Sequence, residues 1–278
     1  MPSPTNSWLF LDTGSKSGAF NMEFDEMLAR RLRDEGGAPT LRLFRWKPWA
    51  ISLGYNQVVD HLDTETCMRD GIDIVRRPTG GRAILHAEEL TYSVVMEAGR
   101  RGILEVYNDI SRALVCGLQL FGVKVALQKT QPNLREGYQH ASSIPCFTTS
   151  ARYEIEWRGR KLVGSAQRRF DDGDHDVVLQ HGSILCGPAH KMLAEYLRVS
   201  GEALRTELRI ELDRKTVDLA EIRGGPVDID ALADCIRRGF EQEWKITLAP
   251  SSLPSTVESE MVQVTTEHQR MPNEHSPG

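Results

Sequence analysis

Apolar and polar positions follow two different periods along this chain, and the periods predict its elements. Apolar residues recur at helical spacing over 18–35, with Gly36 as a stop, and over 103–122, the clearest amphipathic segment. Alternation over 7–14 predicts an edge strand, and β-rich runs at 40–46 and 50–57 predict two strands interrupted at Lys47-Pro48. A short helix is expected over 60–70.

The second half combines a hairpin with helices. A strand is expected at 123–128, residues 151–157 and 159–170 read as strands joined at Arg158-Gly159, and 177–187 reads as the next strand. Beyond Pro188 the pattern is helical at 190–198, 217–223 and 228–244, with Asp228 or Asp230 as the N-cap of the last segment. Helices flank strands without a regular βαβ alternation, which predicts an α+β fold with a mixed or antiparallel sheet.

Composition narrows the class of protein. With 278 residues, 40% hydrophobic residues and a formal charge of −5, the chain can bury a sizeable core and lacks the basic balance of a nucleic-acid-binding surface. It has no apolar run of membrane-spanning length and no signal-peptide pattern, so we expect a cytoplasmic protein without a membrane partner. Residues 250–278 are polar and rich in Pro and Ser, and a disordered tail is expected there.

The five cysteines give neither a disulfide framework nor a zinc site, because their number is odd, their spacing is wide and no CxxC pair occurs. Cys116 and Cys235 lie in apolar helical runs and Cys186 ends a strand, so packing roles are expected for them. Cys146, in the stretch SSIPCF, is the one with a loop context. It could be a buried filler, a metal ligand or a nucleophile.

Three stretches carry candidate chemistry, and each has a plainer alternative. In IVRRPTGGRAILH (74–86), glycines let a ligand approach the backbone and arginines bind phosphate or carboxylate, but a Gly-Gly turn with solvent-facing arginines has the same pattern. Alone, His86 reads as a hydrogen-bonded strand histidine. In GRKLVGSAQRR (159–169), Lys161 is either a site lysine or a snorkelling one. In LQHGSIL (179–185), the small residues mark a close approach or a β-bulge at Gly182.

Together these stretches resemble the biotin/lipoate protein ligase and lipoyltransferase superfamily. RRPTGGRAILH, then CF, then YEI-x(4)-GRKLVGSAQRR and LQHGSIL occur in its order, and NMEFDE and WKPWAISLGYNQ precede them. Within the superfamily the chain is similar to octanoyltransferases that carry a cysteine in the loop before the hairpin. The likeness covers about residues 8–244.

This resemblance implies a fold, a reaction and site residues. The fold is the biotinyl/lipoyl protein ligase catalytic domain over 7–249, with a small helical appendage at about 188–249. The reaction moves an octanoyl group from octanoyl-acyl carrier protein to a lysine of a lipoyl-type acceptor, such as the glycine cleavage H protein, in lipoate biosynthesis, with no cofactor or metal. By the same resemblance, Cys146 is the nucleophile and Lys161 the site lysine. The implied pocket residues are Arg76, Gly80, Gly81, His86, Gly164, Ser165, Gln167, His181 and Gly182.

The implied chemistry sets requirements. Thioester exchange needs a thiolate, and a nearby lysine ammonium would favour the charged form of Cys146. An octanoyl chain needs an apolar tunnel, for which the candidates are Ile74, Val75, Ile84, Leu85, Leu162 and Val163. Burying about seven methylenes at ~0.8 kcal/mol each selects chain length coarsely.

Three alternatives stay open. An ATP-dependent lipoate–protein ligase has three glycines where this chain has Gly80, Gly81 and Arg82, and an Arg-Asn-Asp stretch where this chain has Arg152, Tyr153 and Glu154. An amidotransferase between lipoyl domains would use the same residues, and a module that only binds carrier or lipoyl domains would not need Cys146 and Lys161. A monomer is expected.

Overall fold

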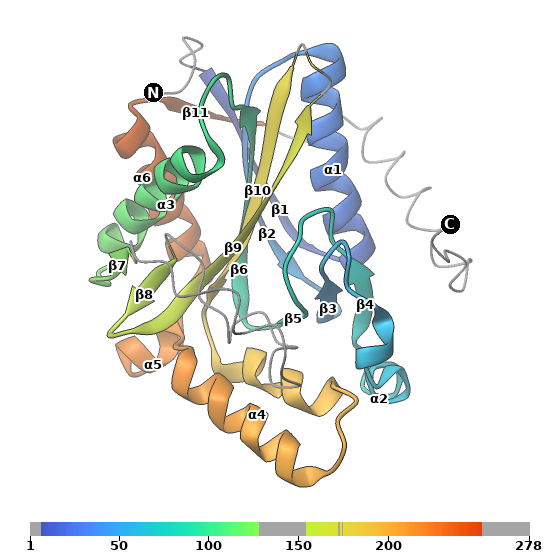
Figure 1. Ribbon diagram of the computed structural model, residues 1–278. Helices are drawn as coiled ribbons and strands as arrows, with labels where there is room; N and C mark the ends of the chain where they lie inside the picture. Colours follow the sequence, from blue (N-terminus) through green and yellow to red (C-terminus); the bar gives the residue numbers. More distant parts are fainter. Residues whose placement is uncertain (1–6, 128–153, 172, 174, 252–278) are drawn as a thin grey trace.

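The computed structural model describes residues 7–127, 154–171, 173 and 175–251 (Figure 1). In this part of the chain a mixed sheet of eight strands has the order β11-β1-β2-β6-β10-β9-β8-β7, and a second sheet has the order β4-β3-β5. The larger sheet contains β1 Ser7–Lys16, β2 Thr40–Trp46, β6 Glu89–Glu97, β7 Ala126–Leu127, β8 Ile155–Trp157, β9 Arg160–Asp171, β10 Asp176–Leu185 and β11 Thr247–Pro250. The smaller contains β3 Ala50–Leu53, β4 Asp73–Arg76 and β5 Ile84–His86. The α+β prediction is confirmed.

Strand β1 is not an edge strand, so that expectation is wrong. It pairs in parallel with β2 on one side and with β11 on the other, where Trp8 is opposite Leu248. Strand β11 also includes Pro250, the residue at which the expected tail begins; residues 252–278 lie outside the described part of the chain. The parallel pairs stop at β2, since β6, β10, β9, β8 and β7 continue the sheet in antiparallel fashion.

Helices cover both faces of the large sheet. Helix α1 spans Gly18–Glu35. Its N-cap is Ser17, whose side chain accepts a hydrogen bond from the Phe20 N–H, and its C-cap is Gly36. It lies on one face, while α3, Ile103–Leu120, and α6, Ile229–Trp244, lie together on the other (Figure 1). Asp228 is the N-cap of α6, as one of the two alternatives predicted.

The chain from Pro188 onward divides between two places. The 3₁₀ helix η4, Pro188–Tyr196, lies at one end of the molecule beside β5 and α2, Thr64–Arg69, and α4, Glu202–Lys215, packs against η4 there (Figure 1). Helix α5, Leu219–Arg223, follows them, whereas α6 and β11 join the main body. A helical appendage over 188–249 therefore does not describe all of this segment. Helix α4 was not predicted, and η4 is a 3₁₀ helix where a regular helix was expected.

The Lys47-Pro48 break moves the chain from one sheet to the other. Strand β2 ends at Trp46 in the large sheet, and β3 starts at Ala50 in the small sheet, which also contains β4 and β5, the two strands that the RRPTGGR segment connects. The 3₁₀ helix η1, Val59–His61, and α2 form the short helical region expected after β3. Within the described residues, no helix combines the length and the apolar character needed to cross a bilayer.

Candidate active site

The RRPTGGR segment forms the connection between β4 and β5, and its arginines bind backbone carbonyls. Arg77 Nε and Nη2 donate to Gly80 O at 3.1 and 2.9 Å, Nη2 also donates to Arg82 O at 2.7 Å, and Nη1 donates to Ser52 O at 2.9 Å. Arg76 Nη1 donates to the carbonyls of residues 54, 55 and 57 at 2.7–3.0 Å. The guanidinium of Arg77 and Nη1 of Arg76 therefore fix the loop and its neighbour.

A second loop lies against the glycines. A Cβ added to Gly54, which follows β3, would lie 1.9 Å from Gly81 O. Gly81 itself has φ +101°, a backbone conformation that side chains disfavour. The Tyr55 N–H donates to Thr79 O at 2.9 Å, so the two loops meet backbone to backbone. We call residues 77–82 the glycine loop.

A small pocket, partly open to solvent, lies beside the glycine loop, whose Arg77 is one of its lining residues. The lining residues come from α1, β2, the glycine loop, β5, β6, β9 and β10: Met22, Trp46, Arg77, Ile84, His86, Thr91, Gly164, Ser165, Ala166, His181, Gly182 and Ser183. Five of the predicted site residues are thus brought together, namely His86, Gly164, Ser165, His181 and Gly182.

Small residues shape one wall of this pocket because β9 and β10 pair there. Gly182 is opposite Ser165, and Ser183 is opposite Gly164. A Cβ at Gly182 would lie 2.5 Å from Gly164 O and 2.8 Å from Tyr92 Cε1. The small-residue stretch of β10 is therefore a close approach between strands in the larger sheet.

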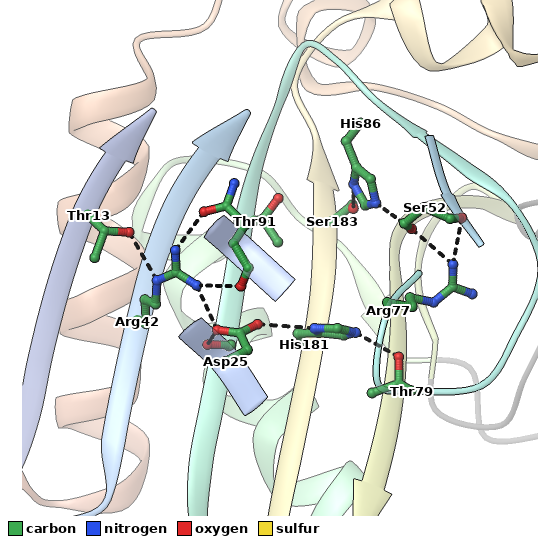
Figure 2. Close-up of polar contacts among 12 residues, drawn as sticks. Thr13, Asp25, Arg42, Ser52, Arg77, Thr79, His86, Thr91, His181 and Ser183 are labelled. Atoms are coloured by element: carbon green, nitrogen blue, oxygen red, sulfur yellow. Dashed lines mark hydrogen bonds and ion pairs between the residues drawn. The ribbon is translucent and has the colours of Figure 1, made fainter. Parts of the chain in front are cut away.

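A buried polar chain crosses the site from α1 to the glycine loop. Arg42 Nη1 donates to Asp25 Oδ1 at 2.7 Å, Asp25 Oδ2 lies 3.2 Å from His181 Nδ1, and His181 Nε2 lies 2.7 Å from Thr79 Oγ1 (Figure 2). Asn21 Oδ1 accepts from Arg42 Nη2 at 2.6 Å, which helps to satisfy the buried guanidinium. His181 is thus held between a carboxylate and the loop.

Burial and pairing determine the ionisation of Asp25 and His181. Burial alone would raise the pKa of Asp25, but Arg42, His181 and Ser93 outweigh burial and hold the pKa below its ordinary value. Burial lowers the pKa of His181. Asp25 is therefore charged and His181 neutral near pH 7, and the neutral ring donates through Nδ1 to the carboxylate and accepts through Nε2 from Thr79.

His86 lies at the end of β5, with its Nδ1 3.3 Å from Ser183 Oγ of β10. Its ring stacks on Trp46, with centroids 3.9 Å apart, and both of its nitrogens have side-chain partners. Trp46 Nε1 donates to Thr91 Oγ1 at 2.7 Å, so this aromatic wall has a fixed orientation.

Lys161 lies near the start of β9 and is buried. Its Nζ is 2.7 Å from Glu154 Oε1, and its carbonyl accepts from the Val217 N–H at 3.0 Å. It is not a snorkelling surface lysine, but it is also not among the described residues that line the pocket. Two intervening residues, Leu162 and Val163, separate it along the strand from Gly164.

Gln167 belongs to a hydrogen-bonded row behind the small-residue wall. Its Nε2 donates to Gln180 Oε1 at 3.1 Å, Gln180 donates to the Tyr92 hydroxyl at 3.0 Å, and Tyr92 donates to Ser165 Oγ at 2.7 Å. Burial raises the pKa of Tyr92 to about 12, so its hydroxyl stays a donor.

Cys146 lies outside the described residues. Of the other cysteines, burial raises the pKa of Cys67 to about 11 and that of Cys186 to about 12. Burial also raises the pKa of Cys116 and of Cys235. A thiol with a raised pKa is a poor nucleophile near neutral pH, and packing roles suit these four.

Sequence reasoning missed several residues of the site. Among the six tunnel candidates only Ile84 is a described lining residue; Met22 and Trp46 supply apolar surface instead. Asn21 and Asp25 were detectable, since both lie at helical spacing on the apolar side of α1, where a carboxylate needs a buried partner. Arg42 gave no signal, because an arginine in a strand usually faces solvent.

Comparison with known proteins assigns the chain to a family. The model of the lipoyl protein ligase A/B catalytic domain matches residues 17–241. The chain belongs to this family. Curated relatives named Octanoyltransferase LipM include those of Symbiobacterium thermophilum, 37% identical over 91% of this chain and 92% of the relative, and Staphylococcus aureus, 32% identical over 94% and 95%.

Solved structures agree with this family fold. A structure from a study of a bipartite lipoate protein ligase and its E2 lipoyl domain from Thermoplasma acidophilum has a TM-score of 0.75 at 20% identity, covering 94% of this chain and 92% of that one. Lipoate-protein ligase A bound with ATP has a TM-score of 0.73 at 19% identity, covering 94% and 95%. The expected ligase-type catalytic-domain fold is confirmed.

Proposed function

We propose that this protein is an octanoyltransferase of lipoate biosynthesis, which moves an octanoyl group from octanoyl-acyl carrier protein through a thioester on Cys146 to a lysine of a lipoyl-type acceptor. The observation that carries the proposal is the likeness, over about nine-tenths of the chain, to several proteins named octanoyltransferase. The glycine cleavage H protein is one such acceptor.

The pocket supports an acyl ligand. Met22, Trp46 and Ile84 offer apolar surface, and the neighbouring lining residues of β9 include Gly164 and Ala166, which are small. At ~0.8 kcal/mol for each buried methylene, an eight-carbon chain gains several kcal/mol of binding. The polar residues of the pocket are largely bound to one another, which suits a neutral ligand.

The transfer balances as two exchanges. The Cys146 thiolate attacks the carbonyl carbon of the carrier's thioester, the bond from that carbon to the carrier's sulfur breaks and the carrier leaves as a thiolate, so one thioester replaces another. The neutral amine of the acceptor lysine then attacks the Cys146 thioester, the amide forms as the bond to the Cys146 sulfur breaks, the Cys146 thiolate leaves, and the amine gives up one proton to solvent. Lys161 supplies a buried cation, fixed by Glu154, that would stabilise a thiolate and a developing oxyanion.

The alternative of an ATP-dependent ligase has less support. In a nucleotide site arginine forks bind phosphates, but here the Arg77 guanidinium donates to Ser52 and to the carbonyls of the glycine loop, and Arg76 Nη1 donates to carbonyls of the neighbouring loop. Arg82 also stands where that ligase class has a third glycine. An amidotransferase between lipoyl domains would share this chemistry and differs only in its donor.

Mass measurement tests the proposal. The protein incubated with octanoyl-acyl carrier protein, without ATP, should gain the mass of one octanoyl group, and Cys146→Ser should abolish the gain. Cys116→Ser is the matched control and should keep the gain. A transfer that needs free octanoate and ATP, with no adduct, would overturn the proposal. An octanoylated lipoyl domain offered as donor separates the amidotransferase, which would accept it.

A further inference from the structure

A buried carboxylate stands behind the pocket wall. Glu89, at the start of β6, has a side chain only 1% exposed and is not a described lining residue. Its Oε1 lies 2.8 Å from His86 Nδ1 and accepts from Thr91 Oγ1 at 2.5 Å and from Ser183 Oγ at 2.8 Å. All three partners line the pocket, so one oxygen atom holds three side chains of its wall.

The hydrogen bonds around Glu89 run in one direction. Nε1–H of Trp46 can only donate, so Thr91 accepts from Trp46 and donates to Glu89. The bond to the carboxylate likewise places the proton of the His86 ring on Nδ1, which leaves Nε2 as an acceptor. Ser52 Oγ, 2.7 Å from that Nε2, is then the donor.

The row continues from Ser52 to the glycine loop. Ser52 Oγ accepts from Arg77 Nη1 at 3.0 Å, and Figure 2 shows His86, Ser52 and Arg77 one after another. The same guanidinium donates to Gly80 O and Arg82 O. A directed chain thus joins the Glu89 carboxylate to the glycine loop, whose Arg77 lines the pocket.

The spacing of Ser52, His86 and Glu89 is that of a nucleophilic triad, but the environment is not. The Ser52 side chain is fully buried, and its oxygen already accepts from Arg77. It is not accessible to a substrate carbonyl. A positioning role, rather than a hydrolytic one, fits this row.

We propose that Glu89 is a positioning residue for the octanoyl transfer: through His86 and Ser52 it fixes Arg77 and, with it, the glycine loop beside the acyl pocket. The inference rests on the proposed function for the identity of the ligand. The link from Glu89 to the loop is a property of the protein without ligand.

The site distinguishes a carboxylate from an amide. Oε2 of Glu89 has no hydrogen-bond partner among the described residues. In Glu89→Gln, an amide nitrogen in the place of Oε2 would lack an acceptor. With the amide turned the other way, its nitrogen would instead face the three groups that donate to Oε1. Glu89→Gln should therefore loosen the row although it keeps the shape of the side chain.

Amide hydrogen exchange of the ligand-free protein tests the link. The Arg77 N–H donates to Leu53 O and the Tyr55 N–H donates to Thr79 O, both at 2.9 Å, so these two amides report whether the loops stay together. Glu89→Gln and Ser52→Ala should each speed exchange at these amides about fivefold or more. The double variant should add little to the larger single effect, because both changes break the same row.

A matched control removes an equivalent contact elsewhere. Thr216 Oγ1 lies 2.7 Å from His190 Nε2, as Ser52 Oγ does from His86 Nε2, but belongs to the end of the molecule beside η4. Thr216→Val should leave exchange at Arg77 and Tyr55 unchanged. Unchanged exchange in Glu89→Gln and Ser52→Ala, or a double variant with the product of the two single effects, would overturn the inference.

Kinetics separate positioning from a general loss of fold. With octanoyl-acyl carrier protein as donor, Glu89→Gln should raise KM about tenfold and change kcat less than about threefold, since it loosens binding walls and not reacting groups. A smaller folded fraction would instead lower the apparent kcat at unchanged KM, which would contradict the inference. If the wild-type protein transfers no octanoyl group, the proposed function fails and the exchange result still decides the link.

Discussion

Gly54 and Gly81 touch backbone to backbone, and Gly54→Ala tests whether the glycine loop must lie where it does. The added Cβ would be 1.9 Å from Gly81 O and 2.8 Å from Gly81 C. Neither atom belongs to a flexible side chain, so one of the two loops must move by more than about 1 Å. The row from Glu89 through Arg77 resists that movement.

The clash in Gly54→Ala should lower both the stability and the activity. Overpacking of this kind costs about 1–3 kcal/mol of the free energy of unfolding, a fall in Tm of several degrees for a chain of this size. A misplacement of about 1 Å in a site can cost about 100-fold in rate, so kcat/KM for octanoyl transfer should fall by about that factor. The activity effect should therefore be far larger than the stability effect.

The assay measures octanoyl transfer to a lipoyl-type acceptor by mass, beside thermal unfolding by circular dichroism. Gly225→Ala is the matched control, since no atom of the described residues lies within 4 Å of a Cβ added to Gly225, and its φ is not positive. It should keep wild-type kcat/KM. If Gly54→Ala stays folded with kcat/KM within about threefold of wild type, the reasoning that links the glycine loop to activity is refuted.

Three further predictions concern packing, the dependence of stability on pH, and the proposed role of Lys161. Gly239→Ala should lower the free energy of unfolding by about 1–3 kcal/mol in urea titration, because the new Cβ would lie 2.3 Å from Gly117 N where α3 and α6 cross; an unchanged midpoint would contradict this. Burial lowers the pKa of His190 to about 4, so the unfolded chain takes up a proton at a higher pH than the folded protein does. The free energy of unfolding should therefore decline as the pH falls from about 6.5 to 4. His190→Gln should flatten that decline. Lys161→Ala should slow acyl-enzyme formation about 100-fold or more in a quenched time course. The double variant Lys161→Ala with Glu154→Gln leaves no unpaired buried charge and should be equally slow. A near-normal rate in either variant would contradict the proposed role of Lys161.

Elements with a strong local sequence pattern were predicted from the sequence. Helix α1 has a capping serine, a stripe of apolar residues and a terminal glycine, and the β8–β9 hairpin turns at Arg158 and Gly159, both of which have positive φ. Helix α4 was missed because it buries only Leu208 and Leu212 and starts at Gly201 without a side-chain cap. The edge position of β1 was wrong because its partner β11 is four residues long and contains a proline, which gives little strand signal.

The site was predicted as a set of stretches and less well as a set of contacts. Glycines and histidines marked His86, His181 and Gly182, since small and titratable residues stand out in apolar strands. The partners of these residues come from distant elements: Asp25 lies 156 positions from His181, and Ser52 lies 34 positions from His86. Long-range pairing of this kind depends on strand order, which periodicity does not determine. Arg76 and Arg77 looked like ligand-binding forks but donate to backbone carbonyls.

A chase of the isolated acyl-enzyme tests the two-step transfer through Cys146 most directly. Protein exposed to octanoyl-acyl carrier protein, freed of the donor and of nucleotide, is mixed with an acceptor lipoyl domain and followed by mass. The octanoyl group should leave Cys146 and appear on one acceptor lysine in equal amount. An octanoyl group that stays on the protein, or that is lost to water while the acceptor remains unmodified, would contradict it.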